Sequence, residues 1–127
     1  MNEKKNPYQG VMFPVKATVI MEGGKGCTIQ HKVGQGWLLR GLPAGICSFA
    51  YQAIFPMYWT LRFGGIDPAE ENPDQIHVNC SRRGCTAQFL VERISDEEAT
   101  ELQKAANMIK LEDLEAEIPY GLSKQLK

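Results

Sequence analysis

The stretch Gly41–Gly65, GLPAGICSFAYQAIFPMYWTLRFGG, carries no charged residue between Arg40 and Arg62. It also holds many of the large apolar side chains of the chain, so we take it as the centre of the fold. Its apolar residues recur at helical spacing and its aromatic residues fill much of the remaining circumference, which predicts a helix that is covered on most sides. The residues in this pattern are Phe49, Ala50, Tyr51, Ala53, Ile54, Phe55, Met57, Tyr58 and Leu61.

The ends of this helix are also indicated by the sequence. Pro43 and Gly45 open it, and the pair Gly64–Gly65 is a typical helix stop. Pro56 has no backbone N–H and crowds the preceding turn, so we expect the helix to kink or restart there. A membrane-spanning helix needs roughly 20 predominantly apolar residues. The proline and polar interruptions of this stretch therefore favour a buried helix, with no membrane as partner.

Four shorter segments have the alternation or the apolar content of β-strands. These segments are Val15–Met21, Lys32–Leu39, Gln75–Cys80 and Cys85–Ile94. In the first, the apolar side chains Val15, Ala17, Val19 and Met21 share one side. The sequence therefore predicts an α+β fold, with a small, mostly antiparallel sheet packed on a kinked central helix.

The C-terminal part of the chain reads as an additional helix. Ser95 and Glu98 form a capping box that starts it. Its apolar stripe is Ala99, Leu102, Ala105, Ala106 and Ile109, followed by a short second pattern of Leu111, Leu114 and Ile118. We thus divide the chain into a tail or edge segment (1–14), an α+β core domain (15–94) and a C-terminal helical extension (95–127). The extension offers a surface for a protein partner or a second copy.

Composition limits the function classes. The 127 residues are 43% hydrophobic and 23% charged, which is typical of one ordinary globular domain. A net charge of −1 gives no footprint for nucleic acid. The N-terminus has no signal-peptide pattern, so we expect a cytoplasmic protein. In that reducing compartment the four cysteines are expected to be free, metal-bound or redox-active.

The cysteines are the main candidates for chemistry. Cys80 and Cys85 flank a tight turn with C-x4-C spacing, so a hairpin would bring their sulfurs together. Cys27 and Cys47 lie at the starts of other elements, and His31 follows Cys27 at C-x3-H spacing. Four thiolates, or three with the imidazole, suit zinc or an iron–sulfur cluster. An equally open interpretation is that the cysteines are inert, small core residues.

A reactive thiol is a further alternative. Arg82 and Arg83 stand close to Cys85, and nearby guanidinium groups favour a thiolate. Cys47 lies near a helix N-terminus, which has the same effect. An aromatic pocket for a substrate would come from Trp37, Tyr58 and Trp59. The catalytic residues of such an enzyme are not fixed by the sequence.

Three blocks of the chain resemble a small uncharacterised prokaryotic protein family marked by three cysteines. The blocks are GCTIQHKVGQGW, PAGICSFAYQAIFPMYWTLRFGG and HVNCSRRGCTAQFLVERI, within about Lys16–Ile94. By position Cys27, Cys47 and Cys80 match the three family cysteines, whereas Cys85 and the C-terminal helix depart from the pattern. The family has no assigned activity, so the resemblance implies a fold unit and a cysteine trio only.

Three functions remain open on the sequence. The first is a small accessory or binding protein with a cysteine-centred zinc or iron–sulfur site. The second is an enzyme that uses a reactive cysteine in an aromatic-lined pocket. The third is a metal-free interaction or oligomerisation domain.

Overall fold

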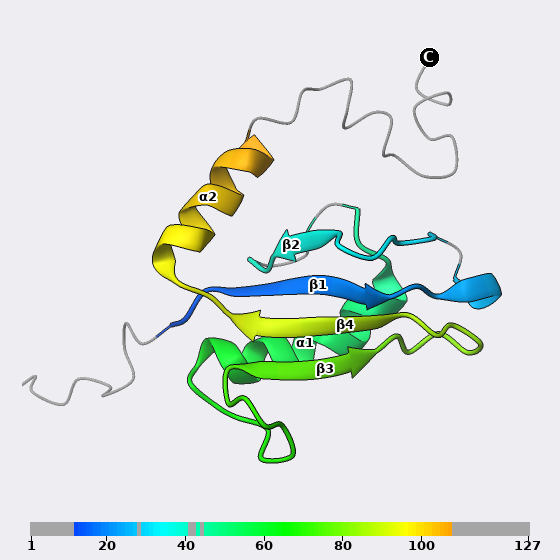
Figure 1. Ribbon diagram of the computed structural model, residues 1–127, viewed down its shortest axis with the longest axis horizontal. Helices are drawn as coiled ribbons and strands as arrows, with labels where there is room; N and C mark the ends of the chain where they lie inside the picture. The colour runs from blue at the N-terminus through cyan, green and yellow to red at the C-terminus, as the bar shows by residue number, and fades with distance from the viewer. Residues whose placement is uncertain (1–11, 28, 41–42, 44, 108–127) are drawn as a thin grey trace, which may run out of the picture.

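The computed structural model describes residues 12–27, 29–40, 43 and 45–107. These residues form one antiparallel sheet and two helices, which confirms the predicted α+β class (Figure 1). The elements are β1 (Val15–Met21), the 3₁₀ turn η1 (Gly24–Gly26), β2 (Gly36–Leu38), α1 (Ser48–Arg62), β3 (Gln75–Asn79), β4 (Gln88–Arg93) and α2 (Asp96–Asn107).

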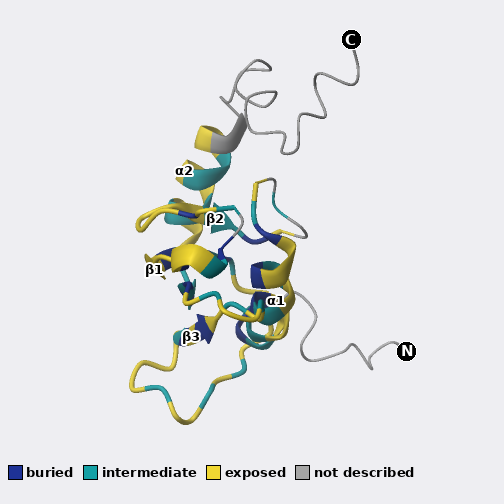
Figure 2. Cartoon of the chain, turned by 90° about the vertical axis from the view of Figure 1, so that its right-hand side faces the viewer, coloured by how far each residue is buried: buried dark blue, intermediate teal, exposed yellow. Residues whose placement is uncertain are grey.

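The sheet has the strand order β2-β1-β4-β3, so β1 and β4 are its central strands. Ala17 lies opposite Val91 in β4, and Val78 of β3 lies opposite Phe89. The inward residues of these strands are almost fully buried, because α1 lies across one face of the sheet (Figure 2). This layer between α1 and the sheet is the hydrophobic core: Val15, Ala17, Val19, Ala50, Ile54, Tyr58, Leu61, Ile76, Val78, Phe89 and Val91.

Helix α1 covers the sheet with only one of its faces. The prediction that it is covered on most sides is wrong, because a single sheet provides a single layer for it to pack against. Four of its outward aromatic side chains, including that of the C-cap residue, are 40–45% exposed: Phe49, Phe55, Trp59 and Phe63. The helix runs as one element across Pro56, and the predicted kink is not confirmed. It ends as predicted, with Gly64 at φ +87°.

Three strands are shorter than the sequence predicts: β3 lacks only its last predicted residue, Cys80, whereas β2 and β4 lack more, and β1 carries an irregularity. β2 begins at Gly36 rather than at Lys32, because a turn with Gly34 at φ +95° precedes it. β4 begins at Gln88, and the residues from Cys85 to Ala87 belong to the connecting loop. A register shift between Val19 and Met21 leaves Met21 47% exposed, so its predicted place in the core is wrong.

Helix α2 leaves the end of β4 and runs beside the β2 edge of the sheet (Figure 1). Ser95 caps it as predicted, with its Oγ accepting a hydrogen bond from the Glu98 N–H at 3.1 Å. The carboxylate of Glu98 pairs with Lys16 of β1, and this hydrogen bond raises the pKa of Lys16. The predicted pattern of residues 109–118 lies outside the described residues. No helix in the described part of the chain has the length and apolar content to cross a bilayer.

Candidate functional site

The turn η1 and the β3–β4 loop meet at one end of the sheet, where α1 also begins (Figure 1). The N–H of Thr86 donates to the carbonyl of Gly23 at 3.2 Å. Nε of Arg82 donates to the carbonyl of Gly26 at 2.9 Å. The backbones of η1 and the β3–β4 loop also lie in contact. A Cβ on Gly26 would overlap the Gly84 carbonyl and lie 2.6 Å from the Cys85 amide nitrogen. Two loops that are distant in sequence are therefore locked together by backbone contacts.

This contact brings Cys27 and Cys85 together. A Cβ placed on Gly23 would lie 3.0 Å from Sγ of Cys27 and 2.7 Å from Sγ of Cys85. The two sulfurs can be no farther apart than the sum of these distances, and the nearby Cys85 thiol helps to lower the pKa of Cys27. Only glycine at position 23 leaves room for both sulfur atoms.

Cys27 is surrounded by backbone donors. Its sulfur accepts a hydrogen bond from the N–H of Gln30 at 3.2 Å, and the N–H groups of Ile29 and His31 also point to it. Burial raises the pKa of the Cys27 thiol, but these N–H groups and the Cys85 thiol outweigh that effect and lower the pKa below its usual value. The loop therefore favours a thiolate at Cys27.

Cys80 has the opposite character. Burial is the main cause that raises its pKa to about 11, and only the N–H of Arg82 lowers it. A hydrogen bond with Cys85 and the charges of Cys85 and Cys47 raise this pKa further. Cys85 thus influences the pKa of both Cys27 and Cys80, and Cys47 lies within electrostatic range of Cys80. The four predicted cysteines gather at one end of the fold, and all four are free thiols.

His31 makes structural contacts in this fold, and its role as a metal ligand stays a prediction. Its ring is 4% exposed and packs edge-on against Trp37, with ring centroids 4.9 Å apart. Its Nε2 accepts a hydrogen bond from the backbone N–H of Cys47 at 3.0 Å. Burial lowers the pKa of His31, which keeps the ring neutral and Nε2 able to accept. The ring therefore fixes Cys47, the N-cap residue of α1, to the Cys27 loop.

Arg82 was predicted to favour a thiolate at Cys85. Its guanidinium instead contacts a backbone carbonyl and an aromatic ring. Besides the Gly26 carbonyl, its guanidinium lies over the ring of Phe49 at 5.3 Å from the centroid. Ser81 of the same loop donates to the carbonyl of Phe49 at 2.7 Å. The β3–β4 loop is thereby tied to the first turn of α1 as well as to η1.

Within residues 12–27, 29–40, 43 and 45–107, no three Cys, His, Asp or Glu side chains are arranged as a ready metal-binding group. The two described cavities are lined by no cysteine, and Trp37, Tyr58 and Trp59 do not line a common one. Comparison with known proteins gives no further assignment: no family model, no curated protein and no solved structure matches the chain.

Sequence reasoning missed three residues that shape this site. Gly23 and Gly26 leave room for the two sulfurs and for the second loop. Gln30 adopts φ +61°, and its amide side chain donates to the carbonyls of Gly24 and Cys27. The glycine-rich run before Cys27 was the available signal for a close backbone approach.

Proposed function

We propose that this chain is a small accessory protein that binds a thiophilic metal ion, zinc or the iron of an iron–sulfur cluster. Cys27, Cys80 and Cys85 would supply the ligands, with Cys47 beside them as a fourth thiol. The observation that supports the proposal is that Sγ of Cys85 lies beside Sγ of Cys27 around Gly23, while Cys85 also raises the pKa of Cys80; Cys27 and Cys80 come from different loops. Soft sulfur donors gathered from distant segments are the ligand set that such metals prefer.

The electrostatics of the cluster support a cation. Neighbouring thiols raise the pKa of Cys80 because two thiolates repel each other. A bound cation reverses this repulsion and displaces the thiol protons. The N–H groups directed at Cys27 and the Arg82 N–H near Cys80 are donors that stabilise thiolates. Because no three described ligands are already arranged around one point, metal binding requires some of these thiols to change rotamer.

Metal competition on the full chain tests this proposal. The chain is purified without oxygen, reduced, and titrated with Zn²⁺ against a chromophoric chelator, while visible absorbance reports any iron–sulfur cluster. We expect one metal site per chain, and at least a tenfold loss of affinity in each of the variants Cys27→Ser, Cys80→Ser and Cys85→Ser. This is the range measured when a ligand or its supporting shell is removed, about 10–100-fold.

A matched control removes the other metal-binding pair on the surface. Nδ1 of His77 lies 2.9 Å from Glu70 and is well exposed, so this pair is the obvious place for adventitious zinc. His77→Ala should leave the measured affinity unchanged. The comparison is a variant in which Cys27, Cys80 and Cys85 are all replaced by serine. If the reduced, folded wild-type chain binds Zn²⁺ no better than this variant, the proposal is contradicted.

A second candidate function is thiol–disulfide exchange, favoured by the lowered pKa of Cys27 beside Cys85. The Cys27 thiolate would attack a substrate disulfide and release one thiol. Cys85 would then attack the mixed disulfide, release the second thiol and leave a Cys27–Cys85 disulfide. With oxidised glutathione as the substrate disulfide, Cys85→Ser should trap the mixed disulfide and release one reduced glutathione, and intact mass detects the adduct. If this variant traps no more glutathione than Cys27→Ser does, the exchange reaction is refuted.

A further inference from the structure

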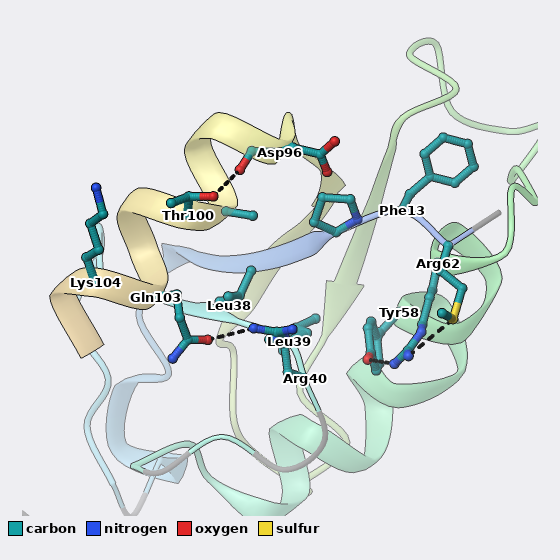
Figure 3. A pocket seen from close by; sticks show the side chains of 13 residues that line it. Phe13, Leu38, Leu39, Arg40, Tyr58, Arg62, Asp96, Thr100, Gln103 and Lys104 are labelled. Carbon is teal, nitrogen blue, oxygen red and sulfur yellow. Dashed lines mark hydrogen bonds between the residues drawn. The ribbon is translucent and has the colours of Figure 1, made fainter. Parts of the chain in front are cut away.

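A second site lies away from the cysteines, in a cavity of about 680 Å³ (Figure 3). Its walls come from α2, the end of β2, the segment before β1 and the last turns of α1. This volume falls within the range of about 300–1,000 Å³ that is usual for small-molecule sites. The apolar part of the lining comes from Phe13, Pro14, Leu38, Leu39 and Ala99.

The charged part of the lining is mainly positive. The described lining residues include one acidic side chain, Asp96, and three basic side chains, Arg40, Arg62 and Lys104. Lys104 is also close to Glu101, at 3.5 Å. The two arginines thus supply the main positive charge of the cavity.

Neutral groups hold both arginines in place. Nη1 of Arg40 donates to the Gln103 side-chain oxygen at 2.9 Å. Nη1 of Arg62 donates to the Tyr58 hydroxyl at 2.5 Å, and its Nη2 contacts the sulfur of Met12 at 3.5 Å. Figure 3 shows both contacts within the cavity wall. A guanidinium carries five N–H donors, so each arginine keeps donors for a ligand.

Arg93 of the same fold differs from Arg40 and Arg62, because its donors are bound to a carboxylate and to backbone carbonyls. Arg93 donates to the Asp74 carboxylate at 2.9 Å and to three backbone carbonyls, those of Leu61, Gly65 and Pro73. Over the described residues, neither Arg40 nor Arg62 has a carboxylate within ion-pair distance. Within the described part of the chain these two guanidinium groups have no acidic partner and lie beside an apolar wall, so they are complementary to an anion that carries a hydrocarbon body.

We infer that this cavity binds a single-chain amphiphile with an anionic head group, a carboxylate or a phosphate. The head group contacts Arg40 and Arg62, and the hydrocarbon chain lies against Leu38, Leu39 and Ala99. This inference is independent of the cysteine site, because no cysteine lines the described cavity.

Calorimetric titration of the full chain with four ten-carbon probes tests the inference. The probes are decanoate, decyl phosphate, decanol and decylamine, each kept below its micelle concentration. We expect decanoate or decyl phosphate to bind at least tenfold more tightly than decanol and decylamine, and the tighter of the two anions identifies the head group. Equal binding of the neutral, cationic and anionic probes, or no binding of either anion, would overturn the inference.

Four arginine variants locate the binding. Arg40→Gln and Arg62→Gln should each weaken binding of the anionic probe about tenfold, the usual effect of losing a charge-assisted hydrogen bond. Arg83→Gln removes an exposed arginine of the β3–β4 loop and should change nothing. Arg62→Lys keeps the charge and should stay closer to the wild type than Arg62→Gln. If Arg83→Gln weakens binding as much as the cavity variants do, the anion binds elsewhere and the inference fails.

Discussion

The contact between the two cysteine loops predicts a severe effect of Gly26→Ala. A Cβ at this position would overlap the Gly84 carbonyl and lie 2.6 Å from the Cys85 amide nitrogen, and neither is the flexible end of a side chain. The Cβ would lie 2.0 Å from the Gly84 carbonyl oxygen, so backbone must move by about 1.4 Å to restore an ordinary contact of 3.4 Å, and overpacking of this kind costs about 3 kcal/mol. The displacement also removes the Cys85 hydrogen bond that lowers the pKa of Cys27. We expect a less stable protein with a less reactive Cys27.

Urea unfolding and alkylation kinetics measure the two effects separately. Gly34→Ala is the control, because Gly34 has φ +95° but no atom within 4 Å of an added Cβ. The control should lose about 1 kcal/mol from backbone strain alone and should leave the alkylation rate of Cys27 unchanged. Iodoacetamide labelling at neutral pH with peptide mapping gives that rate. A Gly26→Ala protein as stable as the wild type, with the same Cys27 rate, would refute the packing of the two loops.

Further predictions concern other parts of the fold. His31→Phe keeps a ring but removes the acceptor of the Cys47 N–H, so the free energy of unfolding in urea should fall by about 2 kcal/mol, and no loss would contradict that hydrogen bond. The raised pKa of Cys80 makes a contribution to stability that is fully present below pH 9 and is lost as the pH rises to about 11. Urea midpoints across that range, measured under reducing conditions, should therefore fall more steeply in the wild type than in Cys80→Ser, and parallel curves would refute this. Lys16→Met removes the partner of Glu98 and should cost at most about 1 kcal/mol, with faster amide exchange confined to α2; faster exchange throughout the sheet would show a different role.

Much of the fold follows from periodicity and from local signals. The alternation in Val15–Met21 and Gln75–Cys80 identifies the buried sides of β1 and β3, because strand side chains alternate with a period of two. Ser95 and the Gly64–Gly65 pair mark helix ends through backbone chemistry that is local to the chain. The exposed aromatic face of α1 could not be predicted in this way, since the helical pattern does not say how many layers will cover it.

The candidate site was predictable only in part. The C-x4-C spacing implies that Cys80 and Cys85 are close, because a hairpin is a local structure. The closeness of Cys27 and Cys85 depends on which loops pack together at the end of the sheet. This packing of distant segments cannot be predicted from a single sequence. The position of His31 beside Cys27 suggested a ligand, whereas the ring instead binds the backbone of Cys47, 16 residues further on.

Disulfide mapping tests the gathering of the thiols most directly. In the double variant Cys47→Ser with Cys80→Ser, only Cys27 and Cys85 remain, and their sulfurs come from loops far apart in sequence. Mild oxidation of this variant at low protein concentration, followed by peptide mass spectrometry, should give an intramolecular Cys27–Cys85 disulfide in nearly every chain. Chains that stay reduced, or that form only disulfide-linked dimers, would contradict the arrangement of the two loops.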